Sequence, residues 1–148
     1  SFSIIDGYMY IVGNRIYRID YQNNYDIVNV YELPEEIQGT VGLCKVQNYY
    51  YLTIYTDKDF NRNPGFIRTT QLENIVSGDY EDIYYQLGIT GTPYMMTEID
   101  ERYYVAEVDQ ANGIVGFDIA DNMIVNVHKI FSCGSGNMDS IVRFYSAY

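Results

Sequence analysis

The segment from Tyr55 to Gly65 carries a dense group of oxygen-bearing side chains. Acidic and amide residues occupy every second position there: Asp57, Asp59, Asn61 and Asn63. Short oxygen side chains that converge in a loop are ligands for hard cations such as Ca²⁺. The pattern therefore predicts a calcium site at Asp57, Asp59 and Asn61. The alternative is a solvated loop, because Asp and Asn are also common in loops that bind nothing.

Two positions depart from the pattern of calcium-binding loops. Arg62 stands where such loops place the glycine of their sharp turn, and Arg68 stands where they place a bidentate glutamate. Both departures favour the solvated loop, and with it a protein that uses no cofactor.

Other catalytic arrangements are weakly represented. His128 is the sole histidine, so a Ser-His-Asp or Cys-His set has no evident base. Cys44 and Cys133 lie on distant predicted elements and, with a single histidine, make no zinc site. Paired carboxyls roughly 5 to 10 Å apart would suit glycoside hydrolysis. The candidates are Glu98, Asp139, Asp57 and Asp109, but the sequence does not fix their separations.

An internal repeat must position these residues. Residues 27–33 read IVNVYEL, and residues 124–130 read IVNVHKI. Further matches place an opening hairpin in each unit, with Asp6-Gly7 as a strong signal for a two-residue turn. Third strands match at 15–20, 66–71 and 113–118, and fourth strands end at 31–33, 85–87 and 128–130. The pattern predicts units at about 2–33, 39–87 and 91–131, with the start of a further unit at 135–148.

Four short antiparallel strands in a unit of roughly forty to fifty-five residues are typical of a β-propeller blade. The chain thus loosely resembles β-propeller proteins, although WD, kelch and Asp-box signatures are absent. The resemblance implies an all-β, propeller-like array of about three four-stranded antiparallel blades, and no particular activity. A β-sandwich is the alternative. Strands are expected near 8–12, 15–20, 26–32, 41–46, 49–55, 66–71, 82–87, 94–99, 102–108, 113–118, 123–130 and 138–144, with a short helical turn near 71–77.

The number of units has a consequence for assembly. A propeller ring typically closes with four to eight blades, and three units fall short of that. We expect a piece of a longer propeller, or a ring completed by another copy and hence self-association. The alternative is that residues 140–148 pair with the first unit and close one smaller β domain over residues 1–148.

Composition excludes some partners. The formal net charge is −11, and scattered basic residues argue against nucleic acid and against anionic membrane surfaces. No apolar stretch approaches the roughly 18 residues of a membrane-spanning helix, so we expect no membrane insertion. Abundant Tyr and Asn with few Lys favour a secreted or cell-surface protein.

Loop lengths predict which end of the units binds a ligand. The connection between second and third strands grows from Gly13-Asn14 in the first unit to residues 55–65 and 107–112 in the others. Elaborated loops on a rigid scaffold are common binding sites. We therefore expect a non-catalytic module that binds a protein or glycan ligand through Tyr55, Asp57, Asp59, Tyr94, Asp109 and Asn112. The alternative is a fragment of a propeller enzyme acting on a carbohydrate or another small polar substrate.

Overall fold

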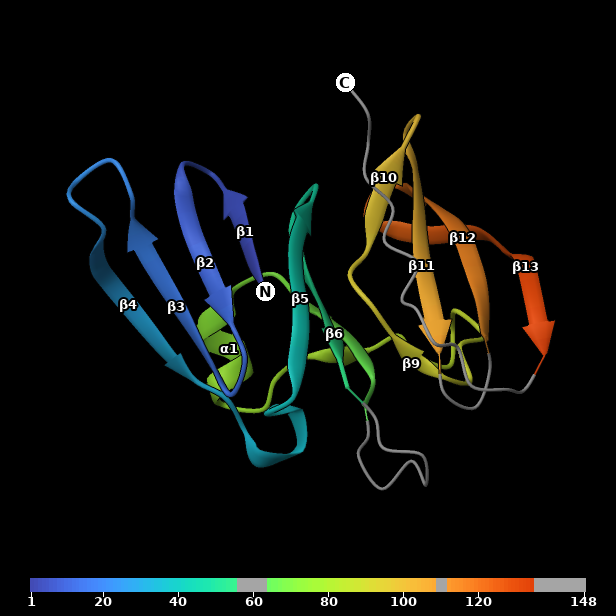
Figure 1. Cartoon of the computed structure of the whole chain (residues 1–148), viewed down its shortest axis with the longest axis horizontal. Helices are drawn as coiled ribbons and strands as arrows, with labels where there is room; N and C mark the ends of the chain where they lie inside the picture. The colour runs from blue at the N-terminus through green and yellow to red at the C-terminus, as the bar shows by residue number, and fades with distance from the viewer. Residues whose placement is uncertain (56–63, 109–111, 135–148) are drawn as a thin grey trace.

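The computed structural model describes residues 1–55, 64–108 and 112–134, and strands dominate this part of the chain. They form three antiparallel sheets that follow one another along the molecule (Figure 1). The expected all-β class with repeated antiparallel sheets is therefore confirmed. Among the described residues, no helix has the length and apolar character needed to cross a membrane.

Each sheet is built from strands that are consecutive in the chain. The first sheet has the order β1 (Phe2–Ile5), β2 (Tyr8–Val12), β3 (Arg15–Asp20) and β4 (Asp26–Glu32). The second has the order β5 (Thr40–Val46), β6 (Tyr49–Ile54), β7 (Phe66–Thr69) and β8 (Glu81–Asp82). The third has the order β10 (Thr97–Ile99), β11 (Arg102–Val108), β12 (Asn112–Ala120) and β13 (Met123–Gly134), and β9 (Thr92–Pro93) also pairs with β11.

Helical structure is confined to two short pieces within the described residues. The 3₁₀ turn η1 (Glu35–Ile37) joins the first sheet to the second, and α1 (Leu72–Val76) lies between β7 and β8. The helical turn expected near residues 71–77 is thus present.

The hairpin turns explain why the chain reverses where it does. Asp6 and Gly7 have φ values of 49° and 81°, as the Asp-Gly signal predicts for a two-residue turn with positive φ at both positions. The equivalent turn of the third sheet gives Asp100 and Glu101 φ values of 50° and 64° without any glycine. The register of the hairpins therefore enforces left-handed backbone there.

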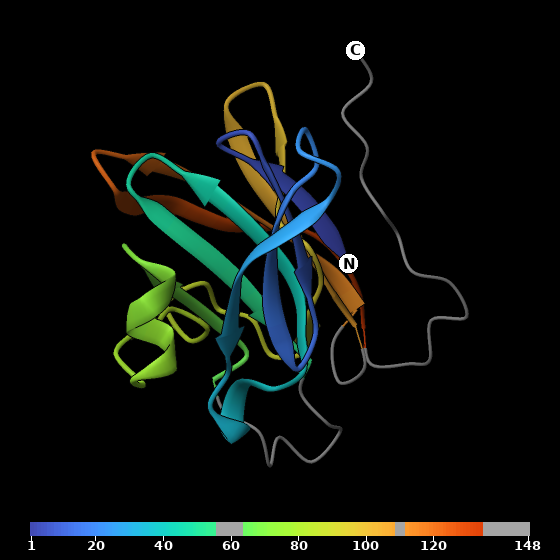
Figure 2. The same cartoon turned by 90° about the vertical axis from the view of Figure 1, so that its left-hand side faces the viewer.

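The core lies between sheets, and the sheets are seen one behind another in Figure 2. One cluster fills the space between the first and second sheets and includes Tyr10, Ile16, Leu52 and Ile67. A second cluster fills the space between the second and third sheets and includes Tyr51, Phe66, Val105 and Phe117. Neighbouring residues of β6 and β7 thus point into different clusters, and the second sheet is buried on both faces.

The opening strands of the sheets lie close together. Ser1 Oγ and Ser3 Oγ each donate a hydrogen bond of 2.5 Å across to β5, to the carbonyl oxygens of Val41 and Leu43. Gly42 of β5 lies against the segment between β9 and β10, where an added Cβ would lie 2.8 Å from Thr53 Oγ1 and 3.1 Å from Met95 Cα. Only a glycine allows this approach. Within the described residues the sheets do not close into a ring.

The first sheet has an uncovered face, which we call the open face: Phe2, Ile4, Ile11, Tyr17 and Val30. Its residues form a row across all four strands, because Phe2 pairs with Ile11, Ile11 with Tyr17, and Tyr17 with Val30. The side chains on the opposite face, such as Tyr10 and Ile16, belong to the first core cluster.

The second sheet corrects two expectations. Its fourth strand is Glu81–Asp82, whereas residues 85–87 form a turn in which Leu87 N–H donates to the Ile83 carbonyl and Gly88 N–H to that of Tyr85. Its third strand is also displaced by one residue from the expected match. Leu52 pairs with Ile67 as Ile11 pairs with Tyr17, so Ile67 corresponds to Tyr17.

Candidate functional site

Two of the predicted ligand-binding residues, Tyr55 and Tyr94, lie at the end of the sheets where the second strand leads to the third, which we call the loop end. Tyr55 directly follows β6, is exposed, and donates its backbone N–H to the Gly39 carbonyl. Tyr94 directly follows β9, is half-buried, and donates its backbone N–H to the Ala106 carbonyl. Both are anchored through the backbone to neighbouring strands.

The other predicted residues remain untested. Asp57, Asp59, Asn61 and Asp109 lie outside the described residues, as does the side chain of Asn112 at the start of β12. The calcium site therefore stays a prediction. In the part of the chain that the structure describes, no group of three or more His, Cys, Asp or Glu residues is arranged to hold a metal ion.

A hollow of about 450 Å³ lies at the loop end of the first sheet, on its open face. Its wall includes Ile11, Val12, the Gly13-Asn14 turn, Tyr17, and Gln38 from the segment after β4. Arg15 and Glu32 complete the wall, with Arg15 Nε 2.8 Å from the Glu32 carboxylate. The hollow thus combines an aromatic ring with amide, guanidinium and carboxylate groups, and its size falls within the range of small-molecule sites.

A buried carboxylate organises the loop end of the third sheet. Glu107 is fully buried near the end of β11, and its Oε2 accepts the backbone N–H groups of Thr90 and Gly91 at 2.9 and 3.3 Å. Lys129 Nζ lies 2.7 Å from Glu107 Oε1. Tyr84 donates its hydroxyl to the Gly91 carbonyl at 2.8 Å. These contacts fix the segment that joins the second sheet to the third, so Glu107 holds structure there.

The candidates for nucleophilic and acid–base chemistry do not come together among the described residues. Glu98 is exposed on β10 and accepts the backbone N–H of Glu101. Cys44 packs against the second core cluster, and burial raises the pKa of its thiol to about 12. A thiol with such a pKa is a poor nucleophile near neutral pH.

His128 lies exposed on the outer strand β13, with Nδ1 2.9 Å from the Asn126 carbonyl oxygen. It pairs with Gly116, as Asn29 of the first sheet pairs with Arg18. His128 therefore corresponds to Asn29, whereas the sequence match suggests that it corresponds to Tyr31. The offset arises at the turn, because Asp20 pairs with Asp26 six residues on, whereas the equivalent Asp118 pairs with Val125 seven residues on.

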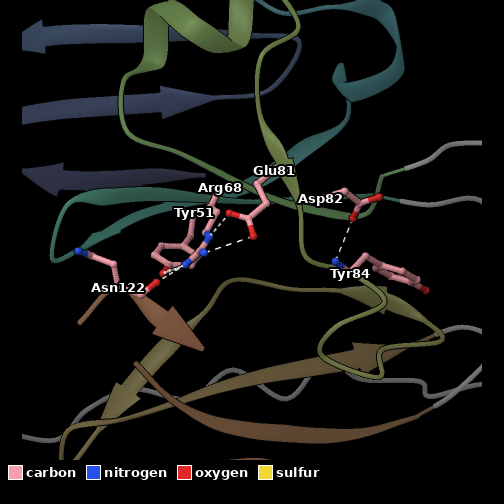
Figure 3. Close-up of polar contacts among 6 residues, drawn as sticks. All are labelled: Tyr51, Arg68, Glu81, Asp82, Tyr84 and Asn122. Atoms are coloured by element: carbon pink, nitrogen blue, oxygen red, sulfur yellow. Dashed lines mark hydrogen bonds and ion pairs between the residues drawn. The ribbon is translucent and has the colours of Figure 1, made fainter. Parts of the chain in front are cut away.

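Arg68 of β7 forms a polar junction between the second and third sheets (Figure 3). Its Nε donates to Glu81 Oε2 at 2.6 Å, and its Nη1 donates to the Tyr51 hydroxyl at 3.4 Å and to the backbone carbonyl of Asn122 in the β12–β13 turn. The guanidinium also lies 4.3 Å from the centroid of the Tyr49 ring. Arg68 is thus paired by its own sheet and by the next one.

Comparison with protein-family models, with curated proteins and with solved structures found no match. Equivalent positions are therefore found by comparing the three sheets of this chain with one another.

Arg18 occupies in the first sheet the place that Arg68 occupies in the second. Arg18 pairs with Tyr10 and Arg68 with Tyr51 at matching ladder positions. Both guanidinium groups stack on a tyrosine, and Arg18 lies 3.8 Å from the centroid of the Tyr8 ring. Sequence matching missed this correspondence because it placed β7 one residue out of register.

Proposed function

We propose that the chain forms consecutive blades of a β-propeller and acts as a non-catalytic recognition module. Three features support the blade arrangement. Each sheet contains a four-stranded meander, each packs on the next through a buried cluster, and the opening strands of the first two sheets approach closely at Ser3 and Leu43. Blades of a propeller have these same neighbours, because inner strands surround the central axis while sheet faces pack together.

The ligand that we propose is a glycan, held at the loop end. The observation that carries this proposal is the hollow of about 450 Å³ beside Tyr17. Sugar rings stack on aromatic faces, and their hydroxyl groups exchange hydrogen bonds with amides and charged groups. Asn14, Gln38 and the Arg15–Glu32 pair supply donors and acceptors around the ring of Tyr17.

The longer connections enlarge the same binding surface in this proposal. β6 and β11 correspond to β2, so the segments that follow them leave the sheets at the loop end. These segments carry Asp57, Asp59 and Asp109. Their acidic side chains are hydrogen-bond acceptors for sugar hydroxyls, and Tyr55 stands exposed at the start of the first segment.

A glycan array with the 148-residue chain tests the proposal, followed by titration of the bound glycans against two tyrosine variants. Tyr17→Ala removes the ring in the hollow and is expected to weaken binding by about tenfold or more. Tyr25→Ala is the matched control, because Tyr25 is exposed in the β3–β4 turn at the opposite end of the sheet.

Absence of any glycan binding would contradict the proposed ligand, and a protein ligand would then be the alternative. Equal loss of affinity in both variants would place the site away from the hollow. Turnover of a bound glycan into products would contradict the non-catalytic assignment and support the enzyme alternative.

A further inference from the structure

A second cavity, of about 140 Å³, lies between the first and second sheets. Its wall is mostly polar and comes from both sheets and from α1, and it includes Tyr10, Arg18, Tyr31, Lys45, Tyr50 and Glu73. This cavity is separate from the hollow at the loop end, because it is on the other face of the first sheet. Its volume suits a small molecule, well below the usual size of a drug-sized ligand.

Arg18 is the group in this wall whose bonding is incomplete. Tyr8 covers one face of its guanidinium, with the ring centroid 3.8 Å from Arg18 Cζ. Its Nε is buried and has no hydrogen-bond partner among the described residues. Leaving a buried donor of a charged group without an acceptor is unfavourable, so Arg18 lacks part of the pairing that a carboxylate would supply to its guanidinium.

The other charged groups around the cavity have partners already. Lys45 Nζ lies 2.6 Å from Asp6 Oδ2. Glu73 Oε1 accepts the hydroxyl of Tyr31 at 3.2 Å. The acids beside the cavity therefore do not neutralise Arg18 directly.

Arg68, the equivalent of Arg18 in the second sheet, has a carboxylate as its hydrogen-bond partner. Across the ladder, Arg68 pairs with Glu81, which supplies its carboxylate. Across the equivalent ladder of the first sheet, Arg18 pairs with Asn29. The Asn29 Oδ1 accepts the backbone N–H of Val30 at 2.8 Å, so this neutral amide is engaged with the backbone.

We propose that the cavity binds the carboxylate group of a small molecule, which takes on Arg18 the place that the Glu81 carboxylate takes on Arg68. A guanidinium and a carboxylate form strong, directional hydrogen bonds. Tyr10 and Tyr50 also line the cavity, and their hydroxyl groups can donate to the same anion. Burial and the neighbouring Tyr50 raise the pKa of Tyr10 above its ordinary value, which keeps its hydroxyl protonated as a donor.

Two sources present this chemistry in a molecule of fitting size: a free small carboxylic acid and the uronic acid unit of an acidic glycan. Sodium acetate and sodium glucuronate are the two probes, with glucose as the neutral analogue of glucuronate. Sodium chloride at the same ionic strength controls for charge screening. The readout is the melting temperature of the 148-residue chain in a carboxylate-free buffer.

At ten times its dissociation constant, a bound probe is expected to raise the melting temperature by about 3 to 6 °C. A rise with both carboxylates supports a site for the carboxylate alone, and a rise with glucuronate only supports an acidic sugar. No rise with either probe, or an equal rise with glucose, overturns the proposal.

Three variants test the role of Arg18. Arg18→Gln should abolish the rise, whereas Arg102→Gln in the third sheet should keep it. Asn29→Glu installs across from Arg18 the carboxylate that Arg68 has, and should both raise the melting temperature and abolish the response to the probes. If Arg18→Gln fails to fold, Asn29→Glu still decides, because an undiminished response in that variant contradicts the site. The result is independent of Tyr17, so it is distinguishable from failure of the loop-end proposal.

Discussion

Ile11 and Leu52 hold the same position in consecutive sheets, yet Leu52 is fully buried while Ile11 is 42% exposed. Ile11 pairs with Tyr17, and Leu52 pairs with Ile67. Val105 holds the equivalent position in the third sheet, where it pairs with Val115 and is also fully buried. The difference is that the second and third sheets each have a preceding sheet packed on this face.

The first prediction compares these two positions. Leu52→Ala should lower the free energy of unfolding by about 2 to 5 kcal/mol, because it leaves a cavity in the first core cluster. Ile11→Ala should cost about 1 kcal/mol or less, as is usual at an exposed site. Urea denaturation at low protein concentration measures both. Equal losses would show that the open face is covered in solution.

The second prediction concerns association through the open face. Phe2, Ile4 and Val30 surround Ile11 there, and an exposed apolar sheet face tends to be covered by a partner. Light scattering should show self-association of the 148-residue chain that grows with concentration. Ile11→Glu should reduce it, whereas Val76→Glu, at an equally exposed aliphatic residue on α1, should not. A monomer at high concentration would argue that nothing needs to cover this face.

The third prediction concerns the buried carboxylate of the third sheet. Glu107→Ala leaves the N–H groups of Thr90 and Gly91 without their acceptor and Lys129 without its partner. Removing one member of a buried charged network should cost roughly 3 kcal/mol or more. Glu35→Ala, at an exposed glutamate, is the control and should stay within about 0.5 kcal/mol. Similar melting temperatures for the two variants would contradict the role assigned to Glu107.

The fourth prediction concerns acid stability. Hydrogen bonds from Asn126 and Arg102 hold the pKa of Asp118 below its ordinary value. The stabilisation from this carboxylate is therefore present above the unfolded-state pKa of about 4 and is lost as the pH falls through the lower folded-state value. Asp118→Asn should flatten the fall in stability between roughly pH 5 and pH 2. Arg102→Gln should flatten it as well, and an unchanged slope in both variants would rule out the linkage.

The hairpins and strand boundaries were accessible to prediction because their signals are local. Asp6-Gly7 and the alternating run of β2 specify a turn and a strand without knowledge of the rest of the chain. The register of β7 was not accessible in this way. Phe66 and Ile67 are both fully buried, since the second sheet is covered on both faces, and a strand buried on both faces loses the alternation that marks register.

The repeated heptads illustrate a related limit. Ile27 and Ile124 open identical tetrapeptides, but the ladders match Asp26 with Val125, because Asp26 pairs with Asp20 and Val125 pairs with the equivalent Asp118. The sequence match therefore differs from the structural match by two residues. Because side chains alternate along a strand, a shift of two leaves each side chain on the same face of the sheet. The cavity beside Arg18 could not be predicted for the same reason, since the pairing of Arg18 with Asn29 depends on a bulge in the ladder.

The second sheet is covered by a core cluster on each of its faces, so it connects the first sheet to the third. Local opening of the first or third sheet exposes one core cluster, whereas opening of the second sheet exposes both. Amide hydrogens of β6 and β7 should accordingly exchange only through the most complete unfolding event. A ligand held between the first and second sheets would therefore stabilise the third sheet as well, by way of the strands that the two clusters share.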